Sequence, residues 1–197
     1  MNSKSTRHGL VLAAMLAVTA CSPPTETISA GELAQQSAIA AGAEEYAAEA
    51  MASVAQAKAS LDAELAAQQG RFVLRRSYRR AEELATTYRT ASEQAASAAG
   101  AGREQARSDA TALIAESRIL LGEVRGMLAA APVGKGSRAD LAAMNADLDQ
   151  AATLITEAET LLGVEEFMEA KSRATSAREA IDGVKSAVEQ ARGMRAS

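Results

Sequence analysis

The sequence predicts an all-α protein, an elongated antiparallel bundle of long, alanine-rich, coiled-coil-like helices. Two features of the composition point to helices. Roughly a quarter of the 197 residues are Ala, the strongest helix former, and only 3% are aromatic, with no Trp. A third observation is that apolar and small residues recur in alternating steps of three and four. This is the heptad rhythm of helices that wind around one another in a left-handed supercoil.

The same composition argues against β-containing folds. Sandwiches, barrels and α/β cores are built from β-branched and aromatic residues, and aromatic residues are scarce here. Although 48% of the residues are hydrophobic on a broad count, a buried Ala removes only about one methyl group from water. We therefore expect helices that approach closely along small-residue seams, stabilised by their length, by packing of all helices together or by self-association.

The first 20 residues have the features of a secretory signal peptide. Lys4 and Arg7 make the start positive, no acidic residue occurs, and residues 10–18 form an apolar run. The run is far shorter than the ~20 residues that a membrane-spanning helix needs. Residues 1–20 are therefore predicted to be a signal peptide.

The signal ends in Val18-Thr19-Ala20-Cys21, which resembles the lipobox of bacterial lipoproteins. The resemblance implies cleavage between Ala20 and Cys21 and attachment of a diacylglyceryl group to the Cys21 thiol, the only thiol of the chain. Added acyl chains, such as palmitate, bind a membrane more strongly than a single chain does. The alternative is an ordinary signal peptide cleaved at an Ala-x-Ala site.

Ser22 bears on localisation. In enterobacterial lipoproteins an Asp after the lipidated Cys favours inner-membrane retention, so Ser22 implies the outer membrane, facing the periplasm. Removal of residues 1–20 leaves 19 basic and 25 acidic residues, a net charge of −6. We expect no nucleic-acid partner, because nucleic-acid binding depends on positive charge.

The mature chain lacks the side chains that many catalytic and metal sites require. His8 is the only His and Cys21 the only Cys, which excludes Ser-His-Asp and Cys-His nucleophiles, His or Cys zinc sites and haem ligation by His. The pairs Glu44-Glu45, Glu82-Glu83 and Glu165-Glu166 are interpreted as solvated helix charges, because adjacent helical residues do not face each other. We predict no catalytic residue, metal or cofactor; a carboxylate-based hydrolase of cell-wall material is the third and weakest alternative.

A tether over residues 21–29 is predicted to precede the first helix. Ser29 and Glu32 form a capping box, which indicates a helix start near residue 30. Gly42 is predicted to interrupt this helix.

A second helix is predicted over residues 44–69, closed by Gly70, and a long return helix begins near Arg75. The predicted seam of the return helix is Tyr78, Ala81, Ala85, Tyr88, Ser92, Ala95, Ala99 and Gly102, and then, after one slip in phase, Ala106, Ala110, Leu113, Ser117, Leu120, Val124, Met127 and Ala131. At Gly100 and Gly102 the pattern fits either a continuous helix with a stutter or two helices.

Residues 132–136, Pro-Val-Gly-Lys-Gly, form the strongest break in the chain. It divides a first helical hairpin with its long return helix, residues 30–131, from a second hairpin, residues 132–197. Ser137 is predicted to cap the next helix and Gly163 to end it. A faint repeat supports two similar halves, since Tyr78-x-x-Ala-x-x-x-Ala85 resembles Phe167-x-x-Ala-x-x-x-Ala174.

The densest cluster of positive charge lies at the start of the return helix. Its members are Arg71, Arg75, Arg76, Arg79 and Arg80, interleaved with Phe72, Leu74 and Tyr78. One interpretation is a basic hairpin tip that binds lipid head groups, lipopolysaccharide phosphates or an acidic protein face. The other is a solvated turn balanced by Glu82 and Glu83, with Tyr78 in the seam.

Residues 42–51, Gly-Ala-Glu-Glu-Tyr-Ala-Ala-Glu-Ala-Met, followed by the Ala/Lys/Leu pattern of residues 57–63, resemble a family of alanine-rich envelope lipoproteins of unknown function. That family has Pro where Ala48 stands and a Gly-Asp-Tyr turn where residues 70–72 are Gly-Arg-Phe. Some members are fused to an OmpA-like peptidoglycan-binding domain. The resemblance covers residues 30–99 and implies helical hairpins without catalytic residues.

The expected function is that of a lipid-anchored periplasmic structural or interaction lipoprotein, a spacer or adaptor at the outer membrane without catalytic activity. Its candidate partners are an envelope protein, lipopolysaccharide, peptidoglycan or a second copy of the chain. The alternative is an accessory binding subunit of an envelope complex that docks through the basic turn of residues 71–80.

Overall fold

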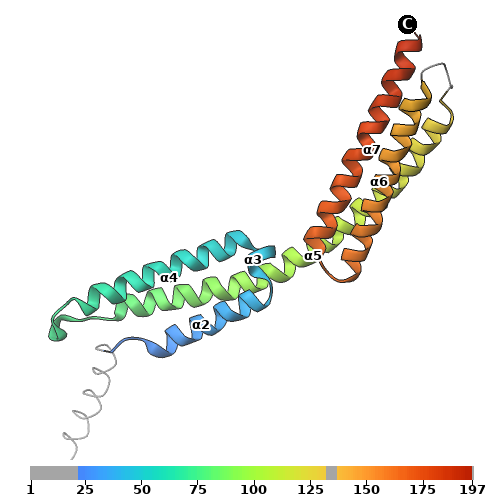
Figure 1. The fold of residues 1–197 in the computed structure, drawn as a ribbon. Coiled ribbons are helices and arrows are strands. Elements are labelled where there is room, and N and C mark those ends of the chain that lie inside the picture. The colour runs from blue at the N-terminus through green and yellow to red at the C-terminus, as the bar shows by residue number, and fades with distance from the viewer. Residues whose placement is uncertain (1–21, 132–136, 197) are drawn as a thin grey trace, which may run out of the picture. The chain divides into compact units, whose positions relative to one another are not determined.

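The computed structural model describes residues 22–131 and 137–196, and the described chain is helical with no strand (Figure 1). Its elements in order are α2 (Thr25–Ala40), α3 (Ala43–Tyr46), α4 (Ala48–Gln69), the 3₁₀ helix η2 (Val73–Arg75), α5 (Arg79–Ala129), α6 (Ser137–Gly163) and α7 (Phe167–Ala196). The all-α helical bundle predicted from the sequence is confirmed. The predicted signal peptide, Cys21 and the break at residues 132–136 lie outside the described residues.

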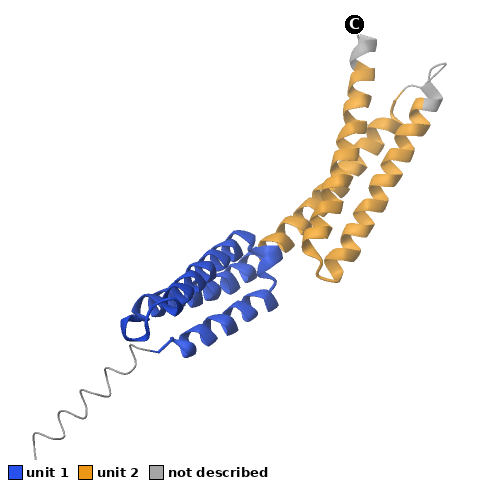
Figure 2. Cartoon of the chain, turned by 60° about the vertical axis from the view of Figure 1, so that its left-hand side comes forward, with its two compact units in different colours: residues 1–102 blue, residues 103–197 orange. Residues whose placement is uncertain are grey.

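The chain forms two compact units, residues 1–102 and 103–197, and helix α5 contributes to both (Figure 2). The first part of α5 packs with α2, α3 and α4, whereas its second part packs with α6 and α7. The packing therefore divides the chain inside α5, and the predicted boundary at Pro132 lies within the second unit. Helix α5 is continuous through Gly100 and Gly102, which answers the question that the sequence left open.

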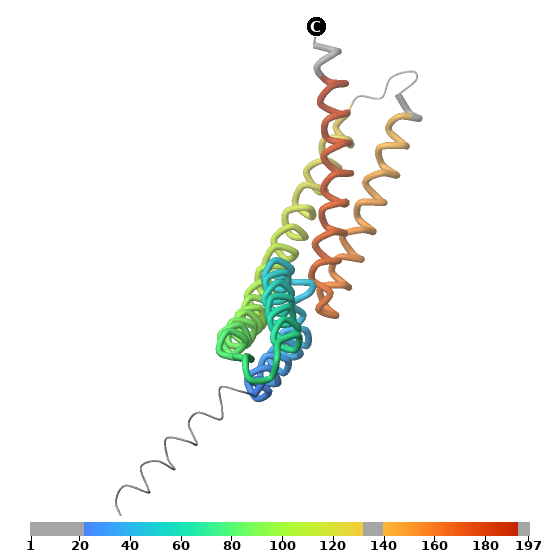
Figure 3. Tube along the Cα trace, turned by 90° about the vertical axis from the view of Figure 1, so that its left-hand side faces the viewer, coloured from blue at the N-terminus to red at the C-terminus, as the bar shows by residue number. Residues whose placement is uncertain are grey.

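In the first unit, α2 runs parallel to the first part of α5, and α4 runs antiparallel to both (Figure 1). Figure 3 shows these three helices nearly end-on. The side chain of Thr27 hydrogen-bonds to Glu82, and Gln35, further along α2, bonds to Tyr88, further along α5. Both helices thus advance in the same direction. The short turn between α4 and α5 makes those two helices antiparallel neighbours, as predicted.

Tyr88 joins three helices of the first unit. Its side chain is fully buried, its ring lies on Gly31 of α2, and its hydroxyl donates a hydrogen bond to Gln35 Oε1. From α4, Lys58 Nζ lies 5.7 Å from the ring centroid. A Cβ at Gly31 would lie 2.5 Å from Tyr88 Cδ1, so the ring fits only against a glycine.

A second close approach lies at the other end of this unit. An added Cβ at Gly102 would lie 2.2 Å from the backbone oxygen of Tyr46 in α3. An added Cβ at Gly100 would meet nothing within 4 Å. Gly102 therefore permits α5 to touch the α3 backbone, while Gly100 has no such role.

The second unit also contains two parallel helices and one helix antiparallel to them. Three ion pairs join the second part of α5 to α7 and to the residues just before it, each between residues 62 positions apart, which shows that α5 and α7 run parallel. They are Arg103–Glu165, Asp109–Lys171 and Glu116–Arg178. Helix α6 pairs with α5 through Arg118–Glu159 and Arg125–Asp149. The residue number rises along α5 from the first pair to the second and falls along α6, so the two helices are antiparallel.

The predicted seams are largely the buried faces. In the first part of α5 the buried positions agree with the predicted seam from Tyr78 to Ala99. In α6 and α7 the buried positions also recur in steps of three and four, from Leu148 to Ala158 and from Phe167 to Val188. In the second part of α5 the prediction is displaced by one residue at three positions. The structure buries Ile114, Leu121 and Leu128, while the predicted Leu113, Leu120 and Met127 are half-buried. Successive steps of four from Gly102 to Ile114 rotate the buried face and cause this displacement.

Several helix ends differ from the prediction. Helix α2 begins at Thr25, inside the predicted tether, and Pro24 rather than Ser29 occupies its N-cap position. A proline before the first turn is already restricted to a helix-compatible φ and has no N–H to leave unsatisfied, so the capping box is not used. As predicted, Gly42 interrupts the helix, with φ +80°, and Gly163 ends α6.

Helices α4 and α5 also differ in detail at their junction. Gly70 ends α4, as predicted, but with right-handed backbone angles rather than as a left-handed cap. The α-helix predicted from Arg75 begins at Arg79, because residues 73–75 form the 3₁₀ helix η2 and Arg76 is extended.

Replacing Gly102 with Ala should destabilise the first unit. The new Cβ would clash with the Tyr46 carbonyl, and overpacking costs about 1–3 kcal/mol, which outweighs the ~1 kcal/mol that Ala gains in a helix. All three Tyr lie in the first unit, so urea unfolding followed by Tyr fluorescence reports on this unit. The matched control Gly100→Ala should raise the free energy of unfolding by up to ~1 kcal/mol. A loss of equal size in both variants would contradict the close contact.

The stability of the first unit should fall at high pH because of Tyr88. Burial, together with the negative charges of Glu32 and Asp62, raises the pKa of Tyr88 above 10.0. Between pH 10.0 and this raised pKa the folded chain keeps a proton that the unfolded chain releases, so the free energy of unfolding decreases as the pH rises. Tyr88→Phe should lose about 1 kcal/mol at pH 8 with the Gln35 hydrogen bond, and should show a smaller decrease above pH 10 in urea unfolding followed by circular dichroism.

Candidate functional site

The turn between α4 and α5 holds the predicted arginine cluster. Helix α4 ends at Gln69, the chain passes through η2, and Tyr78 returns to the core just before α5 begins. The turn is fixed by Gln68, whose buried side chain donates to Glu64 Oε1 at 2.7 Å and accepts from the Ser77 N–H at 3.0 Å. The turn is thus tied to α4 at its base.

Arg76 has a structural role in this turn. Its guanidinium donates to the backbone oxygen of Arg71 at 3.1 Å and to that of Gln69 at 3.0 Å. The carbonyls at the end of a helix have no partner within the helix, and Arg76 supplies one. Cations are also favoured at a helix C-terminus by the helix dipole. The predicted cluster therefore contains one arginine that holds the backbone.

The other arginines divide into two groups. Arg80 pairs with Glu83 within α5, at 3.0 Å. Arg71, Arg75 and Arg79 are exposed and form no ion pair with any described residue. Of the two glutamates that the solvated-turn interpretation invokes, Glu83 pairs with Arg80, and Glu82 accepts a hydrogen bond from Thr27. Three positive side chains remain available at the tip.

Three consecutive apolar side chains project from the same tip. Phe72, Val73 and Leu74 are 71%, 65% and 87% exposed, the only such run among the described residues. Isolated exposed apolar residues are common on protein surfaces, whereas a contiguous group marks an interaction site. We refer to residues 71–75, together with Arg79 at the start of α5, as the apolar-basic tip. The sequence already showed Phe72 and Leu74 between the arginines, but the exposure of the whole run depends on the geometry of η2.

The tip lies at the same end of the first unit as Ser22, which is the first described residue and follows Cys21 in the sequence. Ser22, Pro23 and Pro24 are the residues between Cys21 and α2. Residues 22–27 line a cleft of about 590 Å³ together with Tyr78, Arg79 and Glu82. The Thr27 hydroxyl donates to Glu82 across this cleft at 2.7 Å. The start of α2 and the start of α5 are therefore neighbours, and the turn that carries the apolar-basic tip leads into α5 (Figure 1).

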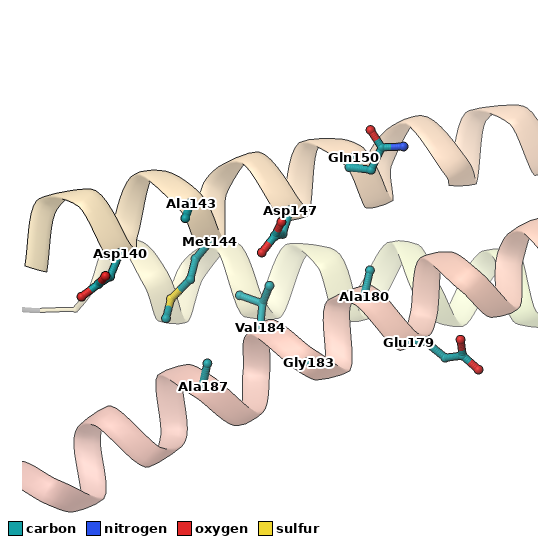
Figure 4. A pocket seen from close by; sticks show the side chains of 10 residues that line it. All are labelled: Asp140, Ala143, Met144, Asp147, Gln150, Glu179, Ala180, Gly183, Val184 and Ala187. Atoms are coloured by element: carbon teal, nitrogen blue, oxygen red, sulfur yellow. The ribbon is translucent and has the colours of Figure 1, made fainter.

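A second candidate is an open groove of about 460 Å³ between α6 and α7 in the second unit (Figure 4). Met144 and Val184 provide its larger apolar side chains, and Asp140, Asp147 and Glu179 are its acidic lining residues. No Lys or Arg is among its lining residues. Such a groove suits an apolar side chain flanked by a cation.

The remaining predictions concern the paired glutamates, metal binding and attachment to a membrane. The paired glutamates are exposed, as predicted, but Glu165 and Glu166 lie in the turn between α6 and α7 rather than within a helix. Glu165 forms an ion pair with Arg103. Within residues 22–131 and 137–196 no three acidic, His or Cys side chains are grouped so that they could hold a metal ion. None of the described helices combines the length and the apolar character needed to cross a bilayer. Ala20 and Cys21, the predicted cleavage and lipid-attachment residues, lie outside this part of the chain.

No protein-family model matches the sequence, and the searches of curated proteins and of solved structures gave no significant match either.

Arg76 and Arg75 should differ in their effect on stability. Arg76→Gln removes two hydrogen bonds to backbone oxygens and should lower the free energy of unfolding of the first unit by about 1 kcal/mol. Arg75→Gln removes the same charge from a side chain without a partner and should change it by less than about 0.5 kcal/mol. Urea unfolding followed by Tyr fluorescence measures both. Equal effects would show that Arg76 does not hold the turn.

Proposed function

We propose that the protein is a lipid-anchored structural or adaptor lipoprotein of the bacterial cell envelope, held at the outer membrane and facing the periplasm, without catalytic activity. The observation that carries the proposal is the position of Cys21. It follows a signal-like apolar run, it is the only Cys of the chain, and it precedes the folded helices by three residues. A lipid on its thiol would hold the first unit at a membrane.

The short connection limits how far the fold can lie from that membrane. Three residues span at most about 11 Å, and two of the three are prolines, which stiffen the chain. The first unit would therefore lie next to the bilayer. The second unit is joined to it through helix α5 and offers the acidic groove between α6 and α7 for contacts with other envelope components.

An accessory subunit of an envelope complex is the second candidate function. The three arginines at the tip that form no ion pair favour it, because an acidic face of a partner protein would supply the missing charges. The two candidates differ in what co-purifies from detergent-solubilised envelopes. An accessory subunit brings one defined complex in fixed proportion, whereas a spacer or adaptor brings none or several.

Cys21→Ser should release the protein from the membrane. Mass spectrometry of the unsubstituted protein is expected to show a mature N-terminus at Cys21 carrying a diacylglyceryl group. The serine hydroxyl does not accept the lipid, so the variant should leave the membrane pellet, either as soluble protein or as an unprocessed precursor. An unmodified Cys21 thiol in the mature protein would overturn the proposal.

Ser22→Asp tests the membrane to which the protein is sorted. In an enterobacterial host the unsubstituted protein should sediment with outer-membrane fractions in a density gradient, and the Asp variant should move to inner-membrane fractions. The conservative variant Ser22→Thr is the matched control and should stay with the outer membrane. Identical distributions of the Asp variant and the unsubstituted protein would contradict outer-membrane sorting through residue 22.

A further inference from the structure

The exposed run Phe72-Val73-Leu74 is not part of the core of the first unit. That core is formed by buried side chains of α2, α3, α4 and α5, and the three residues of the run are not among them. A polar turn would satisfy the fold equally well and would avoid exposing apolar surface to water. The run therefore has to be explained by something outside the chain.

The charge around this run selects the kind of surface. Residues 70–80 contain five arginines and no acidic residue, in a mature chain whose net charge is −6. Arg71 and Arg75 flank the apolar run on both sides, and Arg79 is the first residue of α5. Apolar side chains surrounded by cations match the interface of an anionic bilayer, where acyl chains lie beneath a layer of phosphates.

The position of the tip provides the third argument. It lies at the same end of the first unit as Ser22, where the chain leads to Cys21. If Cys21 carries lipid, as the proposed function holds, the tip faces the leaflet that contains that lipid. The turn is also preformed, because Gln68 and Arg76 fix its backbone. Little ordering is then required on binding.

We propose that the apolar-basic tip is a second membrane contact of the protein. Phe72, Val73 and Leu74 enter the interfacial region of the leaflet, and Arg71, Arg75 and Arg79 bind the phosphates of anionic phospholipids. Together with the lipid on Cys21 this gives two points of attachment at one end of the bundle, so the first unit stands end-on against the membrane.

The contact is tested with the complete mature chain, residues 21–197, carrying Cys21→Ser so that no lipid contributes to binding. Its affinity is measured by co-flotation with vesicles of 30% phosphatidylglycerol in phosphatidylcholine and with vesicles of phosphatidylcholine alone. We expect binding to the anionic vesicles that weakens with salt. Phe72→Ser with Leu74→Ser, and separately Arg71→Gln with Arg75→Gln and Arg79→Gln, should each reduce the affinity by about tenfold or more.

Two matched controls make the same chemical changes elsewhere. Ile119→Ser with Val164→Ser replaces apolar side chains of the second unit that are 66% and 63% exposed. A triple change to Gln at Arg89, Arg107 and Arg173 removes the same charge from exposed helix surfaces. Both controls should bind anionic vesicles as the unsubstituted chain does. Tyr fluorescence during urea unfolding verifies that the tip variants keep a folded first unit.

Insertion is measured directly with a fluorophore. In the Cys21→Ser background no other Cys exists, so Leu74→Cys can be labelled with an environment-sensitive dye. Its emission should shift to the blue on addition of anionic vesicles, whereas a dye at Ile119→Cys should not shift. No vesicle binding, equal binding by the tip variants, or a shift at neither position would overturn the proposal.

Two further outcomes separate this proposal from others. If the tip variants bind vesicles normally but lose a cross-link to an acidic envelope protein, the tip docks a protein and the membrane contact is refuted. The vesicle assay is independent of lipidation, which mass spectrometry of the unsubstituted protein measures. An unmodified Cys21 would refute the proposed function, whereas failed vesicle binding with a lipidated Cys21 would refute the second contact alone.

Discussion

Packing of helices along seams of small residues is the constraint on which both units depend. Alanine seams bury little apolar area per residue, so contacts must be dense for the helices to pack at all. In the first unit two such contacts leave no room for a Cβ, at Gly31 beneath the Tyr88 ring and at Gly102 against the Tyr46 carbonyl. A few larger side chains, such as Val54 and Leu61, complete this core.

The second unit solves the same problem with larger side chains and paired charges. Leu148 and Ile181 are fully buried there, and ion pairs at a constant separation of 62 residues hold α5 and α7 in parallel register. Each exposed pair contributes little stability by itself. Their common offset specifies how the helices align. The faint repeat of Tyr78 and Phe167 corresponds to equivalent places, since each is a buried aromatic residue at or just before the start of the third long helix of its unit.

Packing of the first unit also determines the position of the apolar-basic tip. Because α2 runs parallel to α5, the start of α2 and the turn before α5 must lie together, and the predicted lipid on Cys21 would join them to a membrane. Gln68 and Arg76 stabilise the turn from within, and Phe72, Val73 and Leu74 are exposed and lie outside the core cluster. The proposed adaptor and its second membrane contact both rest on this arrangement.

The sequence by itself determined the helical class, most of the buried seams and the lipobox-like signal, because these depend on local spacing and residue type. The parallel pairing of α2 with α5, the shared helix and the division at Gly102 were decided only by the tertiary structure. Nor could the sequence distinguish Arg76, which bonds to carbonyls, from Arg75, which forms no ion pair. Alanine-rich seams resemble one another, so their spacing identifies a buried face but not the helix that covers it. The partner of each buried face is determined by contacts between residues far apart in the chain, such as the contact of the Tyr88 ring with Gly31.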